Sequence, residues 1–150
     1  MERRQDNGPY GIYAEVEITV EFYDCDPLKI VWHGNYFNYF EVARRALLEK
    51  IGYCYDEMEK TTYAFPVIEA SAKYLRSLRF RDRARVKAIL EEYENRLRIK
   101  YEIRNVQTGV LSAKGLSTQM AVDMKTNDSC FVCPQIFLDK VEAFIKRERQ

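Results

Sequence analysis

Polar and apolar residues alternate along residues 15–22, near the start of the chain. The apolar positions are Val16, Ile18, Val20 and Phe22, and the polar positions are Glu15, Glu17, Thr19 and Glu21. A period of two directs alternate side chains to opposite faces of a β-strand. We therefore predict a strand with one buried and one hydrated face. Pro27, which cannot donate a ladder hydrogen bond, is expected to interrupt it with a loop.

The apolar spacing becomes helical over residues 35–51. The main apolar stripe consists of Tyr36, Phe40, Ala43, Leu47 and Ile51. Further apolar residues extend most of the way round, which is typical of a central helix wrapped by other elements. We expect Asn35 to cap the N-terminus of this helix and Gly52 to end it. Arg44 and the charged residues after it are expected at a solvated end.

The rest of the chain has mainly the pattern of strands separated by short turns. Strands are predicted at residues 65–78, 84–93, 96–105 and 110–124, after a short helical piece at 55–60 and before a helix at 134–146. Short connections favour antiparallel neighbours. The predicted architecture is a single α+β domain over residues 1–150, in which one sheet surrounds one apolar helix. Residues 1–12 are polar with Gly and Pro, and are expected to form a loose arm.

Composition narrows the functional classes. The chain has 150 residues, of which 47% are hydrophobic and 31% charged, as in a globular protein. Its formal net charge of +1 gives no whole-chain argument for binding nucleic acid or an anionic membrane. There is no signal-peptide pattern and no apolar run long enough to span a bilayer, so a cytoplasmic location is expected. The four cysteines are then expected to be free thiols.

Asp26 is the leading candidate for a catalytic acid, because it lies between a predicted strand and a predicted helix. A carboxylate there can take a proton from water or attack a carbonyl directly. The unpaired amides of the helix N-terminus would stabilise the negative charge that develops on a carbonyl oxygen during acyl transfer. From spacing alone, however, a turn-capping role for Asp24 or Asp26 is the better-supported interpretation.

Other reactive side chains give weaker signals. His33, the only histidine, is more simply a packed loop residue than a catalytic one. Neighbouring carboxylates should make Cys25 a poor nucleophile. Cys130 and Cys133 have metal-like spacing but no second ligand pair nearby, so no metal site is expected. The basic residues of 76–87 form either a solvated sheet edge, which is favoured, or a phosphate contact.

The run from Asp24 to Arg44 has the pattern D-x-D-P-x-x-I-V-W-H-G-N-Y-x-x-Y-x-E-x-A-R, which strongly resembles hotdog-fold acyl thioesterases of the 4-hydroxybenzoyl-CoA thioesterase-like branch. The resemblance implies a hotdog fold: a long central helix wrapped by a five-stranded antiparallel sheet, plus a C-terminal helix. It also implies a homodimer or homotetramer in which sheets pair edge to edge and active sites lie at the dimer interface.

By the same resemblance, Asp26 is the general base or nucleophile of thioester hydrolysis. The backbone N–H of His33 polarises the carbonyl, and the His33 side chain assists. The substrate-binding candidates are Lys29, Trp32, Gly34, Asn35, Tyr36 and Glu41, although Glu41 on its own pattern is an ordinary polar helix residue. The substrate is an acyl-CoA or acyl-carrier-protein thioester, as in lipid metabolism, and no metal or cofactor is required.

This sequence departs from the family pattern at two places. Lys29 replaces a Gly, and a residue with a Cβ adopts a left-handed conformation less readily, so the loop is expected either to differ or to turn Lys29 toward the phosphate end of the substrate. Ser77 and Arg81 stand at positions where family members often have Pro and Asp.

Two other functions fit the sequence pattern less well, namely a dehydratase on the same fold and a non-catalytic acyl-binding protein.

Overall fold

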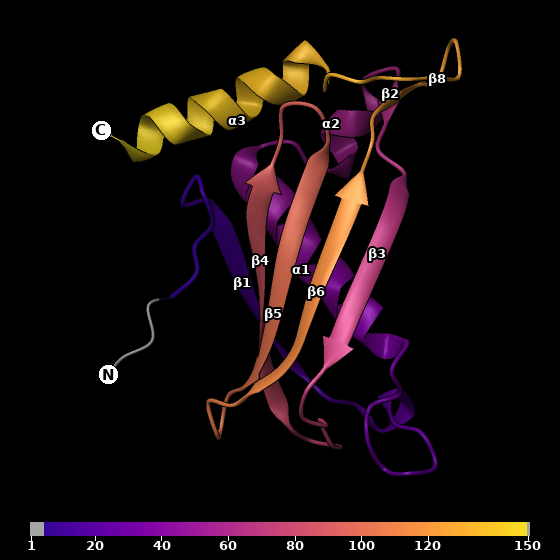
Figure 1. Ribbon diagram of the computed structural model, residues 1–150, viewed down its shortest axis with the longest axis vertical. Coiled ribbons are helices and arrows are strands. Elements are labelled where there is room, and N and C mark those ends of the chain that lie inside the picture. Colours follow the sequence, from indigo (N-terminus) through magenta and orange to yellow (C-terminus); the bar gives the residue numbers. More distant parts are fainter. Residues whose placement is uncertain (1–4, 150) are drawn as a thin grey trace.

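The computed structural model describes residues 5–149. In it, helix α1 (Asn35–Ile51) lies against one face of a five-stranded antiparallel sheet (Figure 1). The strand order is β1-β4-β5-β6-β3, and every neighbouring pair is antiparallel. The strands are β1 (Tyr13–Thr19), β3 (Val67–Tyr74), β4 (Arg83–Glu92), β5 (Leu97–Asn105) and β6 (Leu111–Gln119). This confirms the predicted α+β architecture of one sheet around one apolar helix.

The predicted apolar stripe of α1 is the buried face of the helix. All five stripe residues are 3% exposed or less, and Gly52 ends the helix in a left-handed conformation with φ of 92°. Two expectations were wrong. Gly34, not Asn35, occupies the N-cap position, because the Asn35 side chain binds the preceding loop instead. Arg44 is buried rather than solvated, and its guanidinium forms an ion pair with Glu41, whose side chain stays half exposed.

A close approach between Phe40 and Gly115 sets the position of α1 on the sheet. The Phe40 ring stacks on Tyr101 of β5 with ring centroids 4.6 Å apart. A Cβ added to Gly115 of β6 would lie 2.3 Å from the Phe40 ring. The absence of a side chain at Gly115 therefore lets the helix pack directly against the sheet backbone.

Three strand predictions need correction at their ends. Phe22 does not extend the first strand, because residues 22–24 form a short 3-10 helix (η1, Phe22–Asp24) that leaves the Phe22 side chain 77% exposed. The predicted strand 65–78 is shorter: β3 starts after Pro66 and ends at Tyr74. The predicted strand 110–124 is broken after Gln119, and its last residues join a small second sheet.

The remaining elements cover one end of the sheet (Figure 1). They are α2 (Tyr55–Glu59), the small sheet of β2 (Tyr63–Ala64), β7 (Val122–Asp123) and β8 (Asp128–Ser129), and α3 (Gln135–Glu148). The Phe137 ring of α3 packs against Tyr53 and Phe65, with ring centroids 5.3 and 5.4 Å apart. Within residues 5–149, no helix has the length and apolar character needed to cross a membrane.

The N-terminal segment touches the sheet where the structure describes it. The Asp6 carboxylate forms an ion pair with Lys100, and the Lys87 ammonium donates hydrogen bonds to the Asp6 carbonyl and the Asn7 side chain. Residues 1–4 of the expected loose arm lie outside the described residues.

Substitution of Gly115 by Ala should destabilise the fold by about 1–3 kcal/mol, the usual cost of overpacking a well-packed core. The added methyl would overlap the Phe40 ring, which is held by its stack on Tyr101. Urea unfolding measures the change. Because Phe40→Leu removes the obstructing ring, the double variant should lose less stability than the sum of the two single variants. Strict additivity would contradict the proposed role of this contact.

Candidate active site at the start of helix α1

The Asp26 loop is a tight turn whose geometry follows from its sequence. The Lys29 N–H donates to the Asp26 carbonyl at 2.9 Å, and the Asp26 N–H donates to the Ile30 carbonyl at 2.9 Å. Pro27 takes the second position of this turn, where its fixed φ is favourable. The Leu28 N–H donates to Asp26 Oδ1 at 2.8 Å, so one carboxylate oxygen caps the turn.

Lys29 adopts a left-handed conformation, with φ of 67°. A turn of this kind is commonly followed by one left-handed residue, a position that usually favours Gly. Of the two alternatives for Lys29, the structure contradicts a different loop, because the three hydrogen bonds around Asp26 keep the left-handed conformation; a contact with the phosphate end of the substrate stays a prediction. The loop thus keeps the shape that a Gly would take, at the cost of local strain.

Asp24 joins the loop to the first turns of α1. Its carbonyl accepts hydrogen bonds from the Trp32 N–H at 2.9 Å and from Asn35 Nδ2 at 2.8 Å. Its Oδ2 atom accepts hydrogen bonds from the Tyr39 hydroxyl at 2.9 Å and from the Glu21 N–H at 3.0 Å. Burial and the hydrogen bond to Asp24 both raise the pKa of Tyr39, so this hydroxyl remains a donor. Asp24 therefore has the capping role that spacing alone suggested.

Two backbone amides immediately before α1 have no acceptor. Within residues 5–149, neither the His33 N–H nor the Gly34 N–H donates a hydrogen bond, whereas the next amide, that of Asn35, donates to the Trp32 carbonyl at 2.9 Å. Such amides carry partial positive charge, which the helix dipole reinforces. The Tyr74 hydroxyl donates to the His33 carbonyl at 2.9 Å and fixes this peptide from the opposite side.

Asp26 and His33 line one cavity of about 320 Å³, which β3 and the chain after it close. Tyr36 also lines it, and its ring meets Tyr74 edge-on with centroids 5.0 Å apart. The other lining residues are Leu28, Ile30, Val31, Leu75, Arg76 and Ser77. Sequence reasoning did not select Tyr74 or Ser77 as site residues, because they are distant from Asp26 in the chain. It considered Arg76 only as one of the basic residues of 76–87 that could contact phosphate, which was the less favoured alternative.

The other candidate residues do not line this cavity. Lys29 and Asn35 shape the loop, as described above. The Trp32 ring covers Gly34, where an added Cβ would lie 2.2 Å from the indole, so a side chain at position 34 would displace the Trp32 ring. Glu41 binds the buried Arg44 guanidinium through both carboxylate oxygens, on the second turn of α1.

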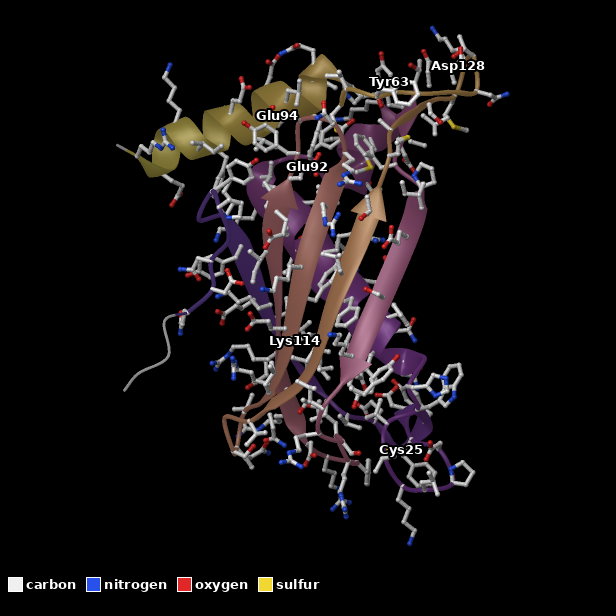
Figure 2. The ribbon with its side chains drawn as sticks, in the orientation of Figure 1. Cys25, Tyr63, Glu92, Glu94, Lys114 and Asp128 are labelled. Atoms are coloured by element: carbon white, nitrogen blue, oxygen red, sulfur yellow. The ribbon has the colours of Figure 1, made fainter. Side chains whose placement is uncertain are left out.

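A larger cavity of about 810 Å³ lies at the opposite end of β3. Figure 2 shows this separation: Tyr63, which lines the larger cavity, lies at one end of the molecule, and Cys25, beside Asp26, lies at the other. Apolar and aromatic residues, among them Phe65 and Met124, predominate in its lining, and the buried Arg44 and Gln119 also contribute. Such a cavity suits the apolar part of a ligand.

Two cysteines have the environment of poor nucleophiles. Burial, followed by the Asp24 charge, raises the pKa of the Cys25 thiol, as expected for a poor nucleophile. Burial raises the pKa of Cys133 to about 12. Among the residues described, no group of three or more His, Cys, Asp and Glu side chains is placed to hold a metal ion.

The family model, a sequence relative and a solved structure that match this chain all carry thioesterase names. The family model of the thioesterase-like superfamily matches residues 20–143. YneP of Bacillus subtilis, which carries a provisional acyl-CoA thioesterase name, is 33% identical over 114 residues, covering 75% of this chain and 82% of YneP. A DHNA-CoA thioesterase structure from Staphylococcus aureus is 30% identical, with a TM-score of 0.80 and 91% of both chains covered. Another Staphylococcus aureus protein, solved with CoA, shares the fold at 20% identity and a TM-score of 0.79, with 89% of this chain and 84% of that chain covered.

Replacing Lys29 by Gly should make the protein about 0.5–1 kcal/mol more stable than replacing it by Ala. Both variants lose the charge, but only Gly relieves the strain at φ of 67°. Urea unfolding of the two variants measures the difference. Equal stability of the Gly and Ala variants would show that the left-handed conformation carries no strain.

Proposed function

This chain belongs to the thioesterase-like superfamily of thioester-hydrolysing enzymes, and we propose that it hydrolyses acyl-CoA-type thioesters at the Asp26 cavity. The resemblance stated from the sequence is thereby confirmed at the level of family and enzyme class. The finer assignment rests on one observation: Asp26 lines the same cavity as His33, whose backbone N–H has no acceptor within residues 5–149.

In the proposed reaction, the thioester carbonyl lies against the His33 and Gly34 amides. These amides stabilise the oxyanion that forms when water attacks the carbonyl carbon. Asp26 takes the proton from that water, because its second carboxylate oxygen is not used by the turn. The tetrahedral intermediate then expels the thiolate, which recovers the proton from Asp26, so that free acid and thiol leave.

Direct attack by Asp26 on the carbonyl is the alternative route and would form a mixed anhydride. A single turnover in oxygen-18 water distinguishes the two. Attack by water places the label in the product acid alone, whereas hydrolysis of the anhydride at the aspartyl carbon places it in Asp26.

The exposed edge of β3 supports assembly as a dimer. Seven of its eight residues are exposed, although several are apolar, and within residues 5–149 no strand pairs with its outer edge. Lys73 lies opposite Lys114 across the β3–β6 ladder, which is an unfavourable like-charge pair. Antiparallel pairing of two β3 strands centred on Ser71 would place Glu69 of the partner subunit beside Lys73. We propose this register for the dimer.

The same register brings the two cavities together. The Tyr74 end of β3, at the Asp26 cavity, would lie next to the Val67 end of β3 in the partner subunit. That end adjoins the larger apolar cavity, which Pro66 and Phe65 line. We propose that the thioester group occupies the Asp26 cavity of one subunit while the acyl group extends toward the larger cavity of the other.

Asp26→Asn should lower kcat/KM for an acyl-CoA by at least about a hundredfold, the effect of losing a general base. The amide oxygen can still accept the Leu28 hydrogen bond, so the loop should keep its shape. Thiol release from a panel of acyl-CoAs measures the loss. As a matched control, Asp24→Asn keeps an oxygen acceptor for Tyr39 and should cost less than about tenfold. Full activity of the Asp26 variant would exclude this assignment.

Glu69→Lys should weaken the dimer by about 2 kcal/mol, or roughly thirtyfold in dissociation constant, because two attractive cross-strand pairs become repulsive. Sedimentation equilibrium measures the change. The control combines Glu69→Lys with Lys73→Glu, which reverses both charges and should restore wild-type affinity. A double variant no tighter than the single variant would rule out the register centred on Ser71.

A further inference from the structure

The backbone of residues 32–34 leads into α1 and carries the two amides that the proposed reaction uses. Its first residue is held by other backbone groups. The Trp32 N–H donates to the Asp24 carbonyl at 2.9 Å, and the Trp32 carbonyl accepts a hydrogen bond from the Asn35 N–H at 2.9 Å. The orientation of Trp32 therefore follows from the loop and the helix on either side of it.

The His33 carbonyl, in contrast, is held by a side chain from another element. It accepts a hydrogen bond at 2.9 Å from the hydroxyl of Tyr74, the last residue of β3, which lies 41 positions further along the chain. The Tyr36 N–H donates to the same carbonyl at the longer distance of 3.4 Å. Among the described residues, Tyr74 provides the only side-chain hydrogen bond to the backbone of residues 32–34.

The bond from Tyr74 also acts on the next amide. The His33 carbonyl and the Gly34 N–H belong to one planar trans peptide unit, so they point in opposite directions and turn together. A donor that fixes the carbonyl therefore fixes the direction of the Gly34 N–H. Donation to the carbonyl also polarises the peptide, which makes the Gly34 N–H a stronger hydrogen-bond donor. Within residues 5–149 this N–H has no acceptor, so a ligand can use it.

The Tyr74 ring is held in place although its side chain is 46% exposed. It meets the ring of the buried Tyr36 edge-on with centroids 5.0 Å apart, and the His33 ring lies at 6.2 Å. Its backbone pairs with Ala113 of β6. Water could satisfy a hydroxyl with this exposure, so the fold itself has little need of the bond to His33. Its effect is concentrated on the peptide that it holds.

We propose that Tyr74 is a positioning residue of thioester hydrolysis, which aims and polarises the His33–Gly34 peptide toward the oxyanion. This inference rests on the proposed function and adds to it a residue of β3 that does not touch the reacting atoms. When water adds to the carbonyl carbon, the electron pair of the C=O bond moves to the carbonyl oxygen, where the Gly34 N–H stabilises the charge. The Tyr74 hydroxyl keeps its proton throughout, and the thiolate recovers its proton from Asp26.

The first test is Tyr74→Phe, which removes the hydroxyl and keeps the ring. Its kcat for an acyl-CoA should fall about tenfold, which is less than the loss of about a hundredfold or more for removing an oxyanion donor outright, because the Gly34 amide remains. KM should stay within about twofold, since the lost interaction strengthens only in the transition state.

The matched control is Tyr93→Phe, the same chemical change at a distant position. Tyr93 lies between Glu92 and Glu94, which Figure 2 labels at the opposite end of the molecule from Cys25. This variant should leave both kcat and KM unchanged. A reduced kcat in the control equal to that of Tyr74→Phe would contradict a specific role for Tyr74.

The second test measures polarisation of the bound substrate directly. An acyl-CoA labelled with carbon-13 at the thioester carbonyl is bound to Asp26→Asn, in which turnover is slow, and its carbonyl stretching band is recorded by infrared spectroscopy. Hydrogen-bond donors lower this frequency. In the combined variant Asp26→Asn with Tyr74→Phe the band should move to higher frequency, an effect that a purely structural role for Tyr74 would not produce.

Each other outcome overturns the inference. An unchanged kcat of Tyr74→Phe or an unchanged carbonyl band would show that the hydroxyl has no effect on the amide. A change confined to KM would assign Tyr74 to substrate binding. A loss that disappears with thioesters of more acidic thiols would assign its hydroxyl to protonating the leaving group. If wild type is active and Tyr74→Phe is equally active, this inference alone fails; if wild type hydrolyses no acyl-CoA, the proposed function fails as well.

Discussion

The hydrogen bonds of Asp24 hold the candidate site together. Its carbonyl accepts hydrogen bonds from the Trp32 amide and the Asn35 side chain, so the chain turns into α1 with the next two amides left without acceptors among the described residues. Its carboxylate reaches Tyr39, one turn further along the helix. A single residue thereby ties the Asp26 loop to the element that is packed most deeply in the fold. The site is positioned mainly by backbone contacts, and these depend on α1 staying in place against Gly115 and the sheet.

Much of this arrangement could be predicted from the sequence, because periodicity and turn chemistry act over a few residues. The apolar stripe of α1, the cap at Gly52 and the strands from Arg83 to Asn105 followed from local pattern. Asp26 became a candidate because it lies at a predicted strand-to-helix junction, and the family resemblance rather than its spacing favoured it as the catalytic acid. The roles of Asp24 and Asp26 differ for reasons that spacing cannot give: Asp24 faces Tyr39, whereas Asp26 faces a cavity.

The expectations from sequence failed where contacts with other segments of the chain determine the local structure. Asn35 is a good N-cap residue by type, yet its amide group binds the Asp24 carbonyl, a contact invisible to a propensity argument. Tyr74, Arg76 and Ser77 reach the cavity only because β3 pairs with β6 and ends beside the loop. No window of sequence around Asp26 contains that information.

Under the proposed mechanism, the chemistry uses one carboxylate and two backbone amides, which differ little between substrates. Selectivity must then come from surfaces away from the reacting atoms. The larger apolar cavity is such a surface, because it adjoins the Val67 end of β3, whereas the Tyr74 end adjoins the Asp26 cavity. In the proposed register, antiparallel pairing of two β3 strands would set the Asp26 cavity of one subunit beside the larger cavity of the other. The thioester group and the acyl group would then be bound by different subunits, and an isolated subunit would have the catalytic residues but an incomplete substrate site.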